Sequence, residues 1–165
     1  MKKLTPKLAK LMAEKYFKKH QDKEGRDFAK VHTTAVVEIA IILAKKISAN
    51  VPTVTISGWL HDIGSTVERS DHAKHSLALL EKKGFEISPL IRKCILNHGT
   101  DGKPESKEAR VLQMADKLSI LSIPVLNILF KQKTITPDDI EFVSKMTTGA
   151  VAYLKALSSN KDIRL

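Results

Sequence analysis

The 165-residue sequence has little cysteine, few aromatic residues and no long hydrophobic run. Its single cysteine, Cys94, cannot form an intramolecular disulfide, so a disulfide-stabilised secreted fold is excluded and a cytoplasmic protein is expected. No apolar segment reaches the length of a signal-peptide core or a membrane-spanning helix, so we expect no membrane partner. One Trp, two Tyr and five Phe leave few rings for stacking on single-stranded nucleic acid, because the core needs most of them.

The chain carries an excess of positive charge, with 28 Lys+Arg against 18 Asp+Glu and a formal net charge of +10. This excess favours anionic partners such as nucleotides, nucleic acid or phosphorylated metabolites. Most of the basic residues are lysine, which is weaker evidence for base recognition than an arginine-rich surface would be. An ordinary solvated, lysine-rich surface explains the charge equally well.

Apolar residues recur at spacings of three and four along almost every long segment, and no segment shows sustained alternation. The pattern predicts an all-α fold, a compact single-domain bundle of about six or seven helices. The connecting segments are short, which argues against a domain boundary within residues 1–165. The expected helices cover residues 5–20, 26–48, about 51–62, 72–83, 89–98, 107–131 with a kink at Pro124, and 137–158.

Two predicted helix ends depend on particular residues. Gly64 is expected to adopt the left-handed conformation that ends a helix just after His61 and Asp62. Ser70 and Asp71 are expected to cap the helix that starts at His72. Both predictions place histidines at helix ends beside solvent.

Four of the six histidines fall near helix ends or on inward faces, and two aspartates accompany them. Imidazole suits Mn, Fe, Co, Ni or Zn, and a carboxylate adds negative charge and can bridge two ions. Each histidine taken alone is also explained as a hydrogen-bonded residue at the edge of the core. As a set they are candidate metal ligands: His32, His61, Asp62, His72, His98 and Asp116.

The order His32, then His61-Asp62-Ile63-Gly64, then Asp116, resembles the HD-domain superfamily of metal-dependent phosphohydrolases, in its small HDIG-type form. The resemblance covers residues 26–121, which would form the metal-binding core, with the helices at 5–20 and 137–158 packed on it. It implies that His32, His61, Asp62 and Asp116 bind one divalent ion.

Members of the family with two metal ions add two histidines between the His-Asp pair and the last aspartate. The resemblance assigns these positions to His72 and His98, with Asp62 as the bridge between the ions. His75 lies three residues after His72 and competes for the first position. The cofactor is therefore one or two divalent ions, with Mn, Fe, Co, Ni, Zn and Mg all open.

The resemblance also narrows the substrate. Ser65 stands where the branch that hydrolyses cyclic dinucleotides has a lysine, and no Gly-Tyr-Pro triplet follows. The chain is much shorter than the nucleotide triphosphohydrolases and alarmone hydrolases of the family. The expected substrate is a phosphate ester of a nucleotide or of a small phosphorylated metabolite, with mono- and diesters both open.

Hydrolysis by such a site needs metal ions that offset the negative charge of the phosphate ester and lower the pKa of bound water. Asp62 and Asp116 are the candidate catalytic residues, the second as a group that orients the attacking water or accepts its proton. Candidate substrate-binding cations are Lys117, Arg69, Lys74 and Arg26. Each of these four also has a structural explanation as a surface charge or salt-bridge partner.

Two other functions remain open from the sequence. One is a nonhydrolytic metal- or nucleotide-binding regulatory HD domain, because a fold does not guarantee turnover. The other is a basic nucleic-acid-binding protein, whose affinity would fall steeply with salt. The last helix also carries an apolar face that would serve either the core or a homodimer contact, formed by Phe142, Val143, Met146, Val151, Tyr153 and Leu154.

Overall fold

The computed structural model of the protein describes residues 2–131 and 136–159. Helices make up most of those residues and the two strands have only two residues each, which confirms the all-α class. In chain order the elements are β1 (Lys2–Lys3), α1 (Pro6–Phe17), α2 (Lys23–Lys46), α3 (Val51–Leu60), the 3-10 helix η1 (Ile63–Thr66), α4 (His72–Lys82), β2 (Phe85–Glu86), α5 (Pro89–Leu96), α6 (Lys107–Ser119), α7 (Ile123–Leu129) and α8 (Pro137–Ser159).

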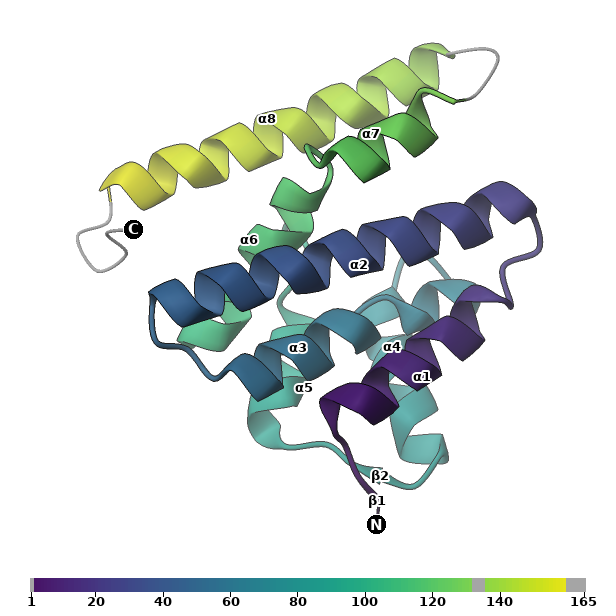
Figure 1. Ribbon diagram of the computed structural model, residues 1–165, viewed down its shortest axis with the longest axis vertical. Coiled ribbons are helices and arrows are strands. Elements are labelled where there is room, and N and C mark those ends of the chain that lie inside the picture. Colours follow the sequence, from purple (N-terminus) through teal and green to yellow (C-terminus); the bar gives the residue numbers. More distant parts are fainter. Residues whose placement is uncertain (1, 132–135, 160–165) are drawn as a thin grey trace.

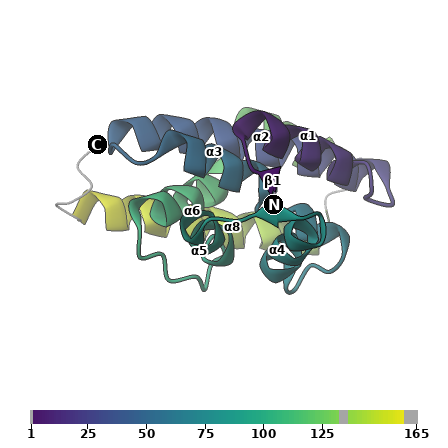
Figure 2. The ribbon, with the colours of Figure 1, turned by 90° about the horizontal axis from the view of Figure 1, so that it is seen from below.

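The helices form two layers. Figure 2 shows α1, α2 and α3 in one layer and α4, α5, α6 and α8 in the other. In Figure 1, α2 runs through the middle of the molecule, with α7 and α8 along one side of it and α1 and α3 along the other. The two short strands pair in parallel, Lys2 with Phe85 and Lys3 with Glu86, and so tie the N-terminal residues to the segment after α4.

Side-chain caps fix where several helices begin. Thr5 Oγ1 accepts a hydrogen bond from the Leu8 N–H, as the sequence predicts for this position, and Pro6 follows as the first helical residue. The start of α2 was predicted three residues too late. The Asp22 carboxylate accepts a hydrogen bond from the Gly25 N–H, and this cap lets the helix include the polar residues from Lys23 onward.

The long helix expected over 107–131 is two helices. α6 ends at Ser119, and α7 starts at Ile123 with Pro124 in its first turn, where a missing N–H costs nothing. The two helices meet at a bend of 48°. The described residues therefore form eight α-helices, one more than the sequence predicted. The expected cap at the start of α4 is also wrong, because Asp71 makes no side-chain cap and the Ser70 hydroxyl donates to Glu68.

Three groups of buried side chains form the core. The largest joins α1, α3, α4 and α5 around the fully buried Leu60, Leu80 and Ile95. The second lies between α2 and α6 and includes Cys94, whose thiol pKa burial raises to about 12. The third is small: Ala35, Ile120 and Val125 pack together between α2 and α7.

The apolar face predicted for the last helix is only partly described. Met146 packs against the third group, while Val151 is exposed. The side chains of Phe142, Tyr153 and Leu154 lie outside the described residues. The described part of this face therefore includes both a core contact and an exposed apolar residue.

Among the described helices, none is by itself both long and apolar enough to cross a membrane. Only α6 and α7 together meet that test of length and composition, as a pair bent by 48°. Most residues of α6 are buried against the rest of this protein.

Candidate metal centre

The His61-Asp62 pair lies where α3 gives way to η1, and this junction is held by hydrogen bonds. The Ser76 hydroxyl of α4 donates to the His61 carbonyl oxygen (2.8 Å) and accepts from the Gly64 N–H (2.8 Å). Because both bonds are buried, α4 is fixed against the chain on both sides of Asp62, at His61 and at Gly64. The serine therefore positions the pair without contacting its side chains.

Gly64 does not adopt the left-handed conformation that the sequence predicted. Among the described glycines only Gly84, after α4, has a positive φ, of 74°. Gly64 is needed for space instead: a Cβ at this position would overlap the backbone of α4 at His72 O and Ser76 N. The missing side chain lets η1 lie directly against the first turn of α4, which brings Asp62 close to His72.

Four histidines reach the same place from four different elements, and each has its Nδ1 fixed by a hydrogen bond. A carbonyl oxygen only accepts, so Nδ1 carries a proton and the Nε2 atom is left to face the centre. The Nδ1 partners are Ser119 Oγ for His32 (3.0 Å), Gly58 O for His61 (2.7 Å), Arg69 O for His72 (2.8 Å) and Ile95 O for His98 (2.6 Å). The Ser119 hydroxyl fits this pattern, since it donates to Asp116 O and accepts from His32.

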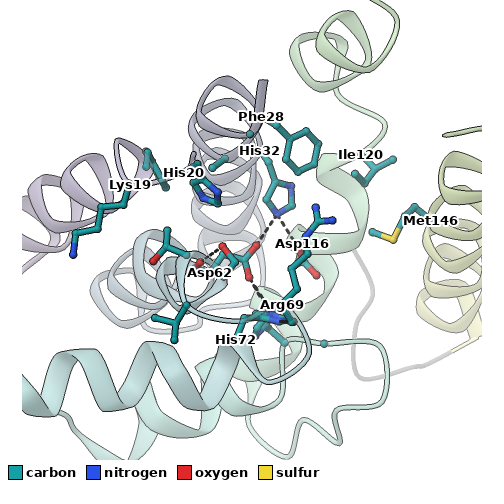
Figure 3. Close-up of a pocket in the computed structure, with 18 of the residues that line it drawn as sticks. Lys19, His20, Phe28, His32, Asp62, Arg69, His72, Asp116, Ile120 and Met146 are labelled. Atoms are coloured by element: carbon teal, nitrogen blue, oxygen red, sulfur yellow. Dashed lines mark hydrogen bonds and ion pairs between the residues drawn. The ribbon is translucent and has the colours of Figure 1, made fainter. Parts of the chain in front are cut away.

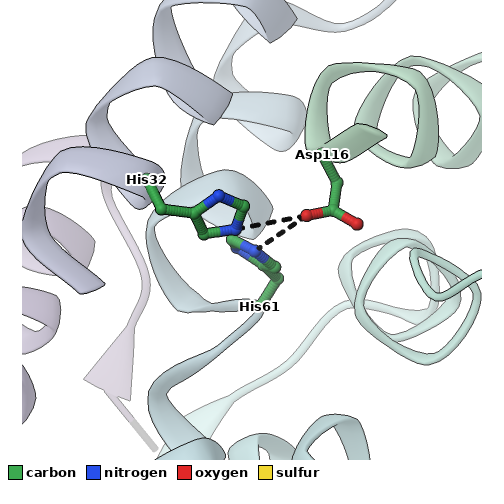
Figure 4. A group of neighbouring side chains, drawn as sticks. All are labelled: His32, His61 and Asp116. Carbon is green, nitrogen blue, oxygen red and sulfur yellow. Dashed lines mark ion pairs between the residues drawn. The ribbon is translucent and has the colours of Figure 1, made fainter. Parts of the chain in front are cut away.

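One group of ligand atoms joins α2, α3 and α6 (Figure 4). His32 Nε2 lies 3.2 Å from Asp116 Oδ1, and His61 Nε2 lies 3.8 Å from the same oxygen. Asp62 Oδ2 completes the group, 3.6 Å from His32 Nε2 and 3.4 Å from His61 Nε2. Two imidazoles and two carboxylates thus face one point.

A second group forms on the other oxygen of Asp62. Asp62 Oδ1 lies 3.2 Å from His72 Nε2 and 3.4 Å from His98 Nε2. The two Nε2 atoms are 2.9 Å apart. His72 is the first residue of α4. The sequence predicted His98 at the end of a helix over 89–98, but α5 ends at Leu96 and His98 lies two residues beyond it. Because each carboxylate oxygen of Asp62 faces a different pair of histidines, Asp62 has the geometry of a bridge.

The residues present fit one or two divalent ions. Among the described atoms, His61 Nε2 is buried and has no hydrogen-bond donor or acceptor as a partner. The Nε2 atoms of His72 and His98 direct lone pairs toward each other once their Nδ1 atoms hold the protons, an arrangement that a cation stabilises. Nitrogen and carboxylate donors of this kind suit first-row transition metals.

The electrostatics agree with this donor set. Burial alone would raise the pKa of Asp116, but its hydrogen bond to His32 and the positive charge of Lys117 hold that pKa well below its usual range. Burial alone would lower the pKa of His32 and of His98, yet the hydrogen bond to an aspartate raises each of them. His61 differs, because burial lowers its pKa to about 4, so it is neutral and available as a ligand at neutral pH.

The centre lies at the bottom of an open cleft of about 800 Å³ (Figure 3). The side chain of Asp62 is 29% exposed, so the centre is accessible from solvent. Two predicted substrate-binding cations line the cleft, Arg69 and Lys117. Lys117 Nζ donates to Asp116 Oδ2 at 2.8 Å, which fixes that carboxylate so that its other oxygen faces His32.

The cleft also contains a residue that sequence reasoning missed. His20, in the loop between α1 and α2, lines the cleft with Asp62 and Arg69 (Figure 3), and burial lowers its pKa. Nothing in its local sequence marks it, because only the folding of α1 back along α2 brings it to the centre. Arg26 holds this loop: its guanidinium donates to His20 O (2.9 Å) and Gln21 O (3.1 Å).

Three sequence candidates lie away from the centre. The guanidinium of Arg26 binds the loop carbonyls and does not line the cleft. Lys74 pairs with Asp71 at 3.1 Å on the exposed side of α4. His75 pairs with Glu68 at 3.3 Å, so of the two competing histidines only His72 faces Asp62.

Comparison with known proteins identifies the family. The family model named HD domain matches residues 30–121, more than half of the chain, and the chain belongs to this family. The HD-domain family is one of metal-dependent phosphohydrolases, and the His/Asp groups described above are suited to hold a metal ion.

Individual relatives can be named. The chain is 27% identical to Ribonuclease Y of Mycoplasma mycoides over 135 residues, which cover 81% of this chain and 26% of that protein. It is 26% identical to Ribonuclease Y of Streptococcus agalactiae over 163 residues, 98% of this chain and 30% of that protein. The chain thus spans less than a third of the length of these relatives. A crystal structure of a predicted HD superfamily hydrolase from an uncultured Thermotogales bacterium shares the fold, with a TM-score of 0.60 over 91% of this chain and 89% of that chain at 24% identity.

Proposed function

We propose that this protein is a divalent-metal-dependent phosphohydrolase that cleaves a phosphate ester of a nucleotide or small phosphorylated metabolite. The observation that carries the proposal is the convergence of four Nε2 atoms and two carboxylates at the bottom of an accessible cleft. A purely structural metal site has its coordination closed by protein ligands, whereas a catalytic one keeps an open position. The partly exposed carboxylate of Asp62 favours the second kind and counts against a nonhydrolytic regulatory domain.

In this proposal His32, His61, Asp62 and Asp116 hold one ion, and Asp62, His72 and His98 hold a second. Divalent ions, when bound, offset the charge of the phosphate ester and lower the pKa of a coordinated water. Asp62 bridges the two groups and keeps them at a fixed separation. Asp116 is a ligand and not a strong base, because His32 and Lys117 hold its pKa well below its usual range.

The cations of the cleft bind the nonreacting phosphate oxygens. The Arg69 carbonyl oxygen accepts the hydrogen bond from His72 Nδ1, and Arg69 lines the cleft, so this residue lies beside the second group of ligands. Its planar guanidinium can donate hydrogen bonds to two phosphate oxygens at once. Lys117 is already paired with Asp116, and so it contributes positive charge to the floor of the cleft without leaving its partner.

The test is hydrolysis of p-nitrophenyl phosphate and of a panel of nucleoside monophosphates by protein reconstituted with Mn²⁺, Co²⁺, Ni²⁺, Zn²⁺, Fe²⁺ or Mg²⁺. The double variant His61→Ala, Asp62→Ala is expected to lose at least a thousandfold in turnover while keeping its helical circular dichroism. His75→Ala is the matched control, because this histidine pairs with Glu68 outside the cleft, and it should keep full activity. Retained turnover in the double variant would contradict the assigned site.

RNA is a second candidate substrate, favoured by the similarity to proteins named Ribonuclease Y and by the net charge of +10. A short 3′-labelled RNA in the same assay distinguishes the two cases. Release of nucleotides from the RNA, with no turnover of monophosphates, would assign a phosphodiesterase. Salt-sensitive RNA binding without cleavage would instead support a nucleic-acid-binding protein.

A further inference from the structure

A second cavity adjoins the metal cleft and has no role in holding the ions. This groove, of about 830 Å³, runs between the first half of α2 and the end of α7. Its lining and that of the cleft share four residues: Asp22, Gly25, Phe28 and Arg69. Because the two cavities meet at these residues, a ligand held at the metal centre can extend into the groove.

The groove has an apolar floor. Phe28, Val31, Ile128 and Leu129 line it from two helices that face each other. Phe28, Val31 and Leu129 also pack on the third core group, so their positions are fixed before any ligand binds. The Phe28 ring lies parallel to the His32 imidazole, with the ring centres 5.5 Å apart. The Phe28 ring, which lines both cavities, is therefore a fixed aromatic surface at the place where they meet.

The charges around the groove differ from those of the metal cleft. Its rim has four basic residues and four acidic ones, so it carries no net charge: Lys23, Lys30, Arg69 and Lys131 against Asp22, Glu24, Asp27 and Asp138. Such a groove offers no net electrostatic attraction to a second phosphate group. A neutral group with a flat apolar part fits the floor, and its hydroxyl or amino groups find carboxylate acceptors on the rim.

We infer that the groove binds the nucleoside part of a nucleotide whose phosphate lies at the metal centre. Arg69 stands at the junction, where its charge meets the phosphate, and the base and sugar extend past Phe28 toward Val31 and Leu129. This inference rests on the proposed function and adds the class of substrate. Nucleotides are preferred to sugar phosphates, because a sugar phosphate has no flat apolar group that could pack on the floor of the groove.

The test is calorimetric titration of the metal-loaded protein with adenosine 5′-monophosphate, uridine 5′-monophosphate, ribose 5-phosphate and inorganic phosphate. The wild type is expected to bind at least one of the two nucleotides ten times or more tightly than ribose 5-phosphate. Val31→Asp places a charge on the floor and should reduce that difference to less than threefold, with affinity for inorganic phosphate unchanged. Ile42→Asp, an exposed position on the same helix, is the matched control and should keep the wild-type preference.

Val31 is partly buried, so a second variant guards against loss of folding. Asp27→Ala removes an exposed carboxylate of the rim and should also weaken nucleotide binding while leaving phosphate binding intact. Equal affinity of the wild type for nucleotides and ribose 5-phosphate would overturn the inference, as would a folded Val31→Asp or Asp27→Ala protein that keeps the full preference. Because binding is measured, a protein that prefers nucleotides but hydrolyses none refutes the proposed function alone, and one that hydrolyses phosphate esters without this preference refutes the groove alone.

Discussion

Replacing Gly64 by alanine is expected to damage both the fold and the second group of ligands, although Gly64 does not line the cleft. The added Cβ would overlap His72 O and Ser76 N and come within 2.8 Å of His75 Cβ. Two of these are backbone atoms, so no side chain can rotate to make room. η1 and α4 must move apart, which separates Asp62 from His72 and breaks the hydrogen bond from Gly64 N–H to Ser76.

The size of the effect follows from these contacts. Overpacking of a close-packed site costs about 1–3 kcal/mol. Loss of a buried hydrogen bond costs about 1 kcal/mol more. We therefore expect the free energy of unfolding of Gly64→Ala to fall by about 3 kcal/mol, which lowers Tm by about 6–12 °C in a protein of this length.

Thermal unfolding followed by circular dichroism, in the presence of chelator, measures this change without a contribution from bound metal. Gly149→Ala is the matched control, because Gly149 lies in α8 with nothing within 4 Å of an added Cβ. Alanine has the higher helix propensity, so this control should unfold at the wild-type temperature or slightly above it. A Gly64→Ala protein as stable as wild type would refute the close-packing explanation for this glycine.

Three further predictions concern the surroundings of the centre. Ser119→Ala removes the acceptor that orients His32 and should weaken metal affinity about 10–100-fold in a metal titration, with the helical content unchanged; unchanged affinity would contradict the role of this hydroxyl. Because the aspartates raise the pKa of His32 and His98, protons compete with the metal, so affinity should fall by about tenfold or more per pH unit below those raised pKa values; a titration with no pH dependence would count against histidine ligands. Cys94, buried and with a thiol pKa near 12, should react with a disulfide reagent at about pH 8 at least a hundredfold more slowly in folded than in unfolded protein, and equal rates would show that the second core group is open.

The positions of many elements could be predicted because local chemistry decides them. Two helices begin as expected, at Thr5-Pro6 and at Ser88-Pro89. In each pair the hydroxyl accepts a hydrogen bond from the first turn, and the proline follows at a position whose N–H would have no partner within the helix. The break after Ser119 could not be found in this way. Pro124 suits a kink within a helix and the first turn of a new one equally well, and the packing of α7 against α2 decides between them.

The side chains that the structure brings together around Asp62 could be named from the sequence, because the His-Asp pair and Asp116 resemble the pattern of the HD-domain family. The geometry around them could not be predicted. Gly64 is needed because η1 lies directly against α4, not because the chain turns there. The side chains of Ser119 and Gln113 form hydrogen bonds with residues far away in the sequence. Gln113, one turn before Asp116, donates to Gly99 O (2.7 Å) and Gly102 O (3.1 Å) and so holds the segment that carries His98. Such tertiary contacts leave no periodic signal in a single sequence.

The central claim, a two-ion centre bridged by Asp62, is tested most directly by metal content. Elemental analysis should be done on protein purified without chelator, wild type beside the double variant His72→Ala, His98→Ala. The account predicts about two ions per chain in the wild type and about one in the variant, because the ligands of the first ion, His32, His61, Asp62 and Asp116, remain. A wild-type protein with one ion that the double variant retains would contradict the second site, and a protein that holds no divalent metal even after reconstitution would contradict the centre as a whole.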